Sequence, residues 1–291
     1  MEIEPFFHAR TSTLTYVVHD VAERVGFVID PVLDFDSASG RTWTESADAV
    51  ADFLDERGIR VPYVLDTHAH ADHLTALPYF RDRFGARTVI GAQIVLVQQV
   101  FREIFNLGDA LPVDGSQFDV LLADGDRLEA GPLSLEARHT PGHTPACLSY
   151  RIGDALFVGD ALFQPDYGTA RCDFPGGSAD ALYDSIRGLY EDLPDSTRVF
   201  TCHDYQPGGR PLAFESTLGE QKRSNAQLHE NTTREEFIAF RKQRDATLSM
   251  PELILPSIQV NVRGGRLPEP ESNGRSYLKL PLNAFDAPPA S

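Results

Sequence analysis

Residues 67–73 read Thr-His-Ala-His-Ala-Asp-His, the densest group of metal-binding side chains in the chain. Neutral imidazole and carboxylate are the usual protein ligands of zinc and non-haem iron. His68 and His70 are two residues apart, so an extended backbone turns both to one side, whereas in a helix two ligands would stand four apart. Asp72 and His73 are adjacent and need a turn to reach the same centre. The spacing therefore predicts a metal-binding loop.

More candidate ligands follow other predicted strands. The apolar run 61–65 precedes the histidine-rich loop and a helical pattern follows it from Leu74, so this loop joins a strand to a helix. Three further candidates come directly after strand-like runs: His143, Asp160 and His203. Because these pieces recur along the chain, we prefer a metal centre to the alternative, a polar surface turn that happens to carry histidine.

Hydrophobic periodicity and turn residues predict the elements that must position these ligands. We expect strands at 14–18, 25–29, 61–65, 88–90, 133–137, 148–152, 155–158 and 198–202. We expect helices from Ser46 to Gly58, from Leu74 to about Gly85, from Ile94 to about Gly108, and after the capping residue Ser178. Residues 31–43 read as a loop, since the preceding strand stops at Asp30. Strands interrupted by helices indicate two β-α halves with the ligands at one rim.

The character of the chain changes after Pro207, where polar helices and an irregular tail follow. Residues 233–236 form a capping-box pattern that opens one helix, and residues 253–260 are mostly apolar. We expect a catalytic domain at 1–210 and a helical and irregular C-terminal extension at 211–291 that packs on that same domain. The extension could cover the active-site mouth or form a homodimer contact, and a plain packing role is an equal alternative.

Composition excludes several classes of partner. The chain has 291 residues and a formal net charge of −17, which argues against nucleic acid or an anionic membrane as partner. An anionic substrate therefore needs local arginines. The three cysteines, Cys147, Cys172 and Cys202, are scattered and form no disulfide framework. The N-terminus lacks the features of a signal peptide, and no apolar run approaches the roughly 18 residues of a membrane span. We expect a cytoplasmic protein.

The candidate ligands are sufficient for one metal or for two. They comprise five histidines and two carboxylates: His68, His70, His73, His143, His203, Asp72 and Asp160. Two histidines and one carboxylate are typical of non-haem Fe(II) oxygenases, which keep open positions for O2 and substrate. Three histidines with a second zinc, and Asp160 as a bridge, would instead turn water into a hydroxide nucleophile. The residue types alone do not decide between these arrangements.

The order of the motifs resembles the metallo-β-lactamase superfamily. The resemblance rests on the 68–73 stretch, the Thr-Pro-Gly-His-Thr turn at 140–144, the Gly-Asp pair that ends at Asp160, and the late His203. It covers roughly residues 10–210 and is specific, because four separate motifs occur in the family's order. It implies an α/β (α+β) αββα sandwich with the metal at one edge of the sheets.

A narrower resemblance is to persulfide dioxygenases of the ethylmalonic-encephalopathy-protein type and their bacterial β-lactamase-like hydrolase relatives. It rests on residues 67–75, 168–174, 182–186 and 203–205. It implies one Fe(II) held by His68, His143 and Asp160. It also implies that Arg171 contacts glutathione and that Tyr205 lies near the metal. Cys172 departs from the family pattern, which has threonine there, and the 165–177 loop is longer.

The leading hypothesis is thus an iron-dependent persulfide dioxygenase that converts glutathione persulfide and O2 to sulfite and glutathione. His70, Asp72, His73 and His203 would orient the ligands and water, or hold a second metal. The second hypothesis is a hydrolase of the glyoxalase II or lactonase kind with two zinc ions per chain. A metal-dependent scaffold or sensor is a third class, which the number of ligands disfavours.

Other residues have simpler interpretations. We expect His139 to be a structural or rim histidine, and His8, His19 and His229 to lie on the surface. Cys147 and Cys202 stand beside apolar strand residues and read as buried, inert thiols. A persulfide-relay role for Cys172 is the less favoured interpretation of its place in the mouth loop. For Arg171, a structural salt bridge and a substrate contact are equal alternatives.

Overall fold

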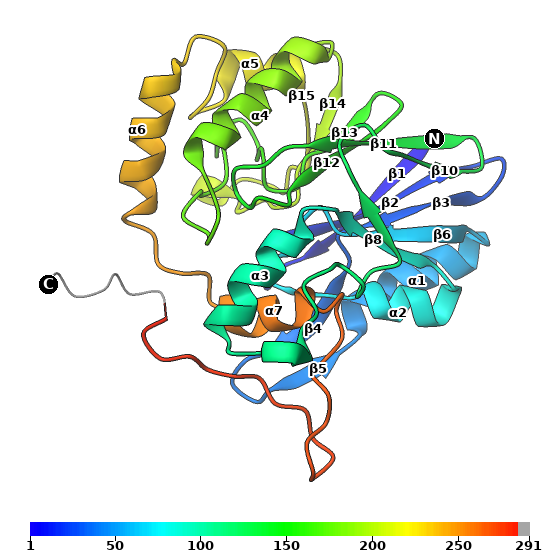
Figure 1. The fold of residues 1–291 in the computed structure, drawn as a ribbon. Coiled ribbons are helices and arrows are strands. Elements are labelled where there is room, and N and C mark those ends of the chain that lie inside the picture. The colour runs from blue at the N-terminus through cyan, green and yellow to red at the C-terminus, as the bar shows by residue number, and fades with distance from the viewer. Residues whose placement is uncertain (285–291) are drawn as a thin grey trace, which may run out of the picture.

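Two six-stranded sheets form the centre of the molecule in the computed structural model, which describes residues 1–284 (Figure 1). The first sheet has the strand order β1-β2-β3-β6-β8-β9. Its strands are β1 Glu2–His8, β2 Thr13–Asp20, β3 Val25–Ile29, β6 Arg60–Leu65, β8 Arg87–Gly91 and β9 Val120–Leu122. The strands β3, β6, β8 and β9 run parallel, so the loops that follow them leave from the same edge.

The second sheet has the strand order β10-β11-β12-β13-β14-β15. Its strands are β10 Arg127–Ala130, β11 Leu133–His139, β12 Leu148–Ile152, β13 Ala155–Phe157, β14 Arg198–Phe200 and β15 Glu215–Thr217. Only β13 and β14 pair in parallel, and these two strands precede Asp160 and His203. The Asp160 carboxylate and the His203 imidazole therefore follow two adjacent strands and lie side by side.

Helices cover the outer faces of both sheets (Figure 1). The helices α1 Glu45–Arg57, α2 Leu77–Phe84 and α3 Ile94–Ile104 lie on the first sheet, and α4 Ala179–Asp192 lies on the second. Buried side chains form three clusters. Two of them lie between a sheet and its helices, and the middle one, with Phe27, Tyr150 and Phe157, fills the space between the two sheets. This is the αββα sandwich that the sequence predicts, so the predicted fold class is confirmed.

Local signals in the sequence place several helix ends correctly. Gly58 ends α1 in the left-handed conformation at φ 62°, a backbone geometry that glycine adopts without steric cost. The Ser178 side chain accepts a hydrogen bond from the backbone of Ala181 and caps α4. Thr233 and Glu236 form the predicted capping box at the start of α6 Arg234–Asp245.

The prediction for residues 31–43 is wrong. This segment contains β4 Val32–Asp36 and β5 Arg41–Trp43, which form a small sheet with β7 Leu74–Thr75. The strand β7 also delays the start of the predicted helix at Leu74, since α2 begins at Leu77. Pairing between β4 and β7 spans some forty residues, and periodicity within one segment gives no sign of it.

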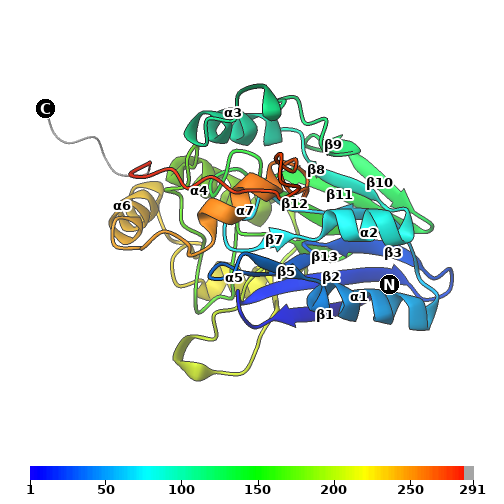
Figure 2. The ribbon, with the colours of Figure 1, turned by 90° about the horizontal axis from the view of Figure 1, so that it is seen from below.

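Residues after 210 contact both halves of the sandwich. The helix α5 Leu218–Ser224 follows β15, and α6 packs on α4. The helix α7 Ile254–Asn261 packs on β7, as Figure 2 shows from below. No helix among the described residues is long and apolar enough to cross a membrane.

Candidate metal centre

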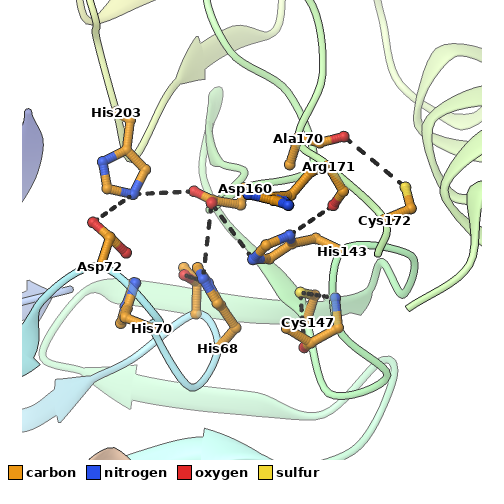
Figure 3. Close-up of polar contacts among 12 residues, drawn as sticks. His68, His70, Asp72, His143, Cys147, Asp160, Ala170, Arg171, Cys172 and His203 are labelled. Atoms are coloured by element: carbon orange, nitrogen blue, oxygen red, sulfur yellow. Dashed lines mark hydrogen bonds and ion pairs between the residues drawn. The ribbon is translucent and has the colours of Figure 1, made fainter. Parts of the chain in front are cut away.

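Loops that follow β3, β6, β11, β13 and β14 meet at one edge of the sandwich and bring the candidate ligands together (Figure 3). Ligand atoms of His68, His143 and Asp160 all lie within 4.8 Å of one another. Asp160 Oδ2 is 3.7 Å from His143 Nε2 and 4.0 Å from His68 Nε2. All three residues are buried, at 0, 6 and 7% exposure. Two imidazoles and one carboxylate thus surround one point.

Several polar atoms in this triad and in the residues beside it have no hydrogen-bond partner among the described residues. They are His68 Nε2, His70 Nδ1, His73 Nε2, His203 Nε2 and Asp160 Oδ1. A buried nitrogen or oxygen without a partner normally costs about 1–3 kcal/mol, so five in one cluster need an explanation. A cation that accepts their lone pairs provides it, and the donor set fits a transition metal ion.

Neighbouring groups fix which ring nitrogen each histidine presents. His143 Nδ1 lies 2.8 Å from the Arg171 carbonyl, to which it donates, so His143 Nε2 keeps its lone pair. His203 Nδ1 lies 3.3 Å from the Ser12 carbonyl, with the same consequence for His203 Nε2. Bonds of this kind hold a ligand ring in the orientation and tautomer that a metal requires.

Asp30 is a residue of the centre that the sequence analysis missed. Its carboxylate accepts hydrogen bonds from the Thr67 backbone at 2.7 Å, the Thr67 hydroxyl at 3.0 Å and His70 Nε2 at 2.9 Å. Since the single hydroxyl proton of Thr67 goes to Asp30, Thr67 Oγ1 accepts from His68 Nδ1 at 3.0 Å. Asp30 thereby sets the tautomers of His68 and His70. An Asp-Pro pair at a strand end reads as a simple stop, which hid this role.

Burial and neighbouring charge tune these groups toward metal binding. Burial, reinforced by adjacent imidazoles, lowers the pKa of His68 and His70 well below the usual value, so both rings are neutral. Burial raises the pKa of Asp160 despite the nearby His203 and His143 rings. Burial lowers the pKa of His203, but the Asp72 and Asp160 carboxylates outweigh that effect and raise it overall. A bound cation would favour the ionised carboxylate and the neutral imidazole.

The remaining predicted ligands lie beside the triad but do not join it. His203 Nε2 is 3.4 Å from both Asp160 Oδ1 and Asp72 Oδ2. His73 Nδ1 lies 3.3 Å from Asp72 Oδ2. In the described residues, His70 groups with Asp72 and His73, or with Cys202 and His203, rather than with the triad. A second cluster of donors therefore adjoins the first.

A cavity of about 690 Å³ opens onto the centre, and Asp160, His143 and Asp72 form part of its wall. Arg171 and Tyr205, the two predicted substrate residues, also line it. Tyr205 is 43% exposed, and its ring stacks on His203 with 5.7 Å between centroids. The cavity is large enough for a thiol of peptide size, since ligand pockets commonly span about 300–1,000 Å³.

Arg171 already has partners in this structure. Its Nε and Nη2 donate to the two oxygens of Asp173 at 2.5 and 2.6 Å, and its Nη1 donates to the Ser249 carbonyl at 2.6 Å. Its other two N–H groups have no acceptor among the described residues and can bind a substrate. Arg244 lines the same cavity and forms no ion pair or side-chain hydrogen bond with the described residues. Both guanidinium groups can therefore meet an anionic substrate.

Other histidines and cysteines divide between confirmed and wrong interpretations. His139 bonds to the Pro145 carbonyl at 3.0 Å and joins no ligand group among the described residues. The prediction that His19 lies on the surface is wrong, because it is 4% exposed and packs against Phe53. Cys147, Cys172 and Cys202 are all buried free thiols, and burial raises the pKa of Cys147 to about 12. Such thiols are poor nucleophiles.

The fold and the buried ligand group together define a metal-binding protein built on an αββα sandwich. A model of the metallo-beta-lactamase superfamily matches residues 9–203. The chain belongs to this superfamily of metal-dependent enzymes.

Relatives within the superfamily carry different names. The chain is 51% identical to a probable metallo-hydrolase of Burkholderia pseudomallei, over 98% of this chain and 100% of that protein. It is 44% identical to glyoxylase B2 of Dictyostelium discoideum over 97% of each chain. It is 30% identical to the human mitochondrial persulfide dioxygenase ETHE1, over 90% of this chain and 88% of that one. It spans 65% of the length of the beta-lactamase hydrolase-like protein of Xylella fastidiosa, to which it is 51% identical.

Among solved structures, ETHE1 from Myxococcus xanthus superposes with a TM-score of 0.73 at 33% identity, covering 91% of this chain and all of that one. The predicted family is thereby confirmed.

Proposed function

We propose that the chain is a mononuclear, iron-dependent persulfide dioxygenase that acts on a low-molecular-weight persulfide such as glutathione persulfide. One Fe(II) per chain would be held by His68, His143 and Asp160. In the overall reaction, RSSH, O2 and H2O give RSH, sulfite and two protons, so the outer sulfur is oxidised and O2 is reduced. When bound, Fe(II) supplies the redox-active centre that this oxidation needs and that zinc lacks.

The observation that carries this proposal is the separation of His70 from the triad. A zinc centre of the three-histidine type would need His68, His70 and His143 around one ion. Here His70 Nε2 is bonded to Asp30, and His70 belongs to other ligand groups than the triad. Two imidazoles and one carboxylate are the donor set of non-haem iron oxygenases. The similarity to the ETHE1 proteins points in the same direction.

The chain's own residues would bring the reactants together and limit water at the centre. The aromatic rings of Phe163, Tyr167 and Tyr205 pack against one another beside His203 and give the cavity an apolar wall. The bond from His143 Nδ1 to the Arg171 carbonyl connects the triad directly to the mouth loop. A substrate carboxylate bound by the Arg171 side chain would thus be held by the same residue whose carbonyl bonds to the proposed ligand His143. This arrangement favours a fixed orientation of the sulfur.

An oxygen electrode tests the proposal. Anaerobically prepared Fe(II) protein should consume O2 when glutathione persulfide is added and should release sulfite in equal amount. The zinc-loaded protein serves as the matched control and should consume none. If the iron form takes up no O2 while the zinc form hydrolyses thioesters or lactones, the proposal is wrong.

A dinuclear zinc hydrolase is the second candidate. It is favoured by the position of His203 Nε2, 3.4 Å from both Asp72 and Asp160, where a second cation could sit. The names of the Burkholderia and Dictyostelium relatives agree with it. Metal analysis separates the two candidates, since the hydrolase predicts two zinc ions per chain and the dioxygenase predicts one iron.

A further inference from the structure

We propose that Asn261, at the end of α7 in the C-terminal extension, positions the histidine-rich loop of the metal centre. Asn261 is 1% exposed and lies nearly two hundred residues after this loop in the chain. Among the described residues, its side-chain amide bonds only to the loop and to the strand that follows it. The extension would therefore be part of the catalytic domain, and its last helix would determine how well the loop binds a metal.

The amide makes three hydrogen bonds. Asn261 Nδ2 donates to the His70 carbonyl and to the His73 carbonyl, at 2.8 Å each. Asn261 Oδ1 accepts from the Thr75 backbone N–H at 2.9 Å. Since the carbonyl groups only accept and the N–H group only donates, these partners determine the orientation of the amide. Both of its donor hydrogens are used.

These bonds fix the backbone of the turn that carries the ligands. Residues 66–73 contain no helix or strand, so the His70 and His73 carbonyls lack partners from regular secondary structure. One nitrogen bonds to both carbonyls and thereby fixes the distance between them. The turn with Asp72 and His73 lies between the two carbonyls, and His68 lies two residues before His70. The directions of these side chains consequently depend on a contact outside the loop.

The helix that presents Asn261 is itself held firmly. Ile254, Ile258 and Val262 are buried in the core beneath the first sheet. The Gln98 side chain on α3 donates to the Val262 carbonyl at 3.0 Å. Gly265 follows with φ +82°, and a Cβ there would lie 2.5 Å from Pro78 Cδ and 3.0 Å from the Thr75 carbonyl oxygen. The chain thus turns tightly against the strand that leaves the loop, and α7 acts as a rigid support.

The same helix offers a matched control in Gln259. Gln259 is 2% exposed, and its amide also makes three hydrogen bonds. Those bonds reach Leu255 and Lys279, and none of them reaches the loop. Replacing either amide removes a similar set of buried bonds from one helix, so the two substitutions should destabilise the fold to a similar degree. Only Asn261→Ala releases the ligand backbone.

Zinc binding measured by chelator competition tests the proposal without relying on any activity. Substitution of a residue that supports a metal ligand typically weakens metal affinity by about ten- to a hundredfold. We expect Asn261→Ala to raise the dissociation constant for zinc at least about tenfold, while Gln259→Ala binds like the unaltered protein. At excess zinc, a tenfold change removes about 1.4 kcal/mol of zinc-dependent stabilisation, which thermal unfolding with and without zinc detects.

Asn261→Asp keeps the test usable if the alanine variant does not fold. The aspartate still accepts from the Thr75 N–H but cannot donate to the two carbonyls, so zinc affinity should again fall. Unchanged zinc affinity in a folded Asn261 variant would overturn the proposal. Equal losses in the Asn261 and Gln259 variants would overturn it too, because they would reveal general destabilisation. The proposed persulfide reaction could fail independently, since this readout requires neither O2 nor a persulfide.

Discussion

The metal centre and the mouth of its cavity are built in opposite ways. At the centre, His68 and His70 are 0% exposed, and Asp30, Thr67 and the Arg171 carbonyl fix the ring orientations. At the mouth, Tyr205 is 43% exposed, Arg171 pairs with the partly exposed Asp173, and Arg244 forms no ion pair among the described residues. A buried and preorganised centre loses little entropy when it binds a metal, whereas a mouth with long charged side chains can adapt to different substrates.

This contrast predicts two kinds of defect. Substitutions at the centre should reduce metal content and leave substrate preference unchanged. Substitutions at the mouth should change KM and leave the metal in place. A variant that violates this division would show that the two regions are coupled more tightly than their contacts indicate.

The largest effect is expected from Asp160→Ala. Asp160 is the only anion in the triad, and it contacts His68, His143 and His203. The variant should fold but retain little iron, as metal analysis of the purified protein would measure. Asp166→Ala is the matched control, because Asp166 lines the same cavity but pairs with Arg210. Full iron content in Asp160→Ala would refute the ligand assignment.

Asp30→Ala should have the next largest effect. The substitution leaves the Thr67 N–H and His70 Nε2 without their buried acceptor, at about 1–3 kcal/mol per group. We expect lower thermal stability together with about ten- to a hundredfold weaker metal binding. Asp34→Ala is a suitable comparison, since Asp34 is a buried carboxylate that bonds to Ser46 at the start of α1 and, among the described residues, to none of the candidate ligands. Equal metal binding in both variants would mean that Asp30 has only a structural role.

Asp30 and Asn261 also show what the sequence could and could not predict. The seven candidate ligands stand out because their residue types are rare in such density, and the main strands because their apolar runs are long. Asp30 carries no such signal, since a single aspartate before proline is a common strand end. Asn261 acts across nearly two hundred residues, through backbone atoms that every sequence possesses. The short strand β4 was missed for a related reason, because one of its pairing partners, β7, lies far from it in the chain.

At the mouth, Arg171→Ala should raise KM for glutathione persulfide more than it lowers iron content. A hydrogen bond to a charged group contributes about 1.5–3 kcal/mol, which corresponds to about ten- to a hundredfold in KM. Steady-state kinetics of the iron-loaded variant would measure this. Arg187→Ala is the control, as Arg187 bonds to the Glu230 carbonyl outside the cavity.

Arg244→Ala sharpens the same comparison. Arg244 has no ion pair among the described residues, whereas Arg171 is held by Asp173. A rise in KM confined to the Arg244 variant would transfer the substrate contact to α6 and would leave Arg171 as a structural residue. A rise in both would mean that two guanidinium groups share the anionic substrate.

The smallest effect is expected from His139→Ala, which tests how sharply the centre is bounded. His139 lies only four residues before the ligand His143, yet its Nε2 bonds to the Pro145 carbonyl at 3.0 Å. No ligand group among the described residues includes His139. The variant should keep its iron and most of its activity, with at most a loss of about 1 kcal/mol in stability from the missing hydrogen bond. His143→Ala, measured beside it, should lose the metal. If the two variants lost iron to the same extent, the assignment of His139 to the rim would be wrong. Both histidines of the 139–147 turn would then contribute to metal binding.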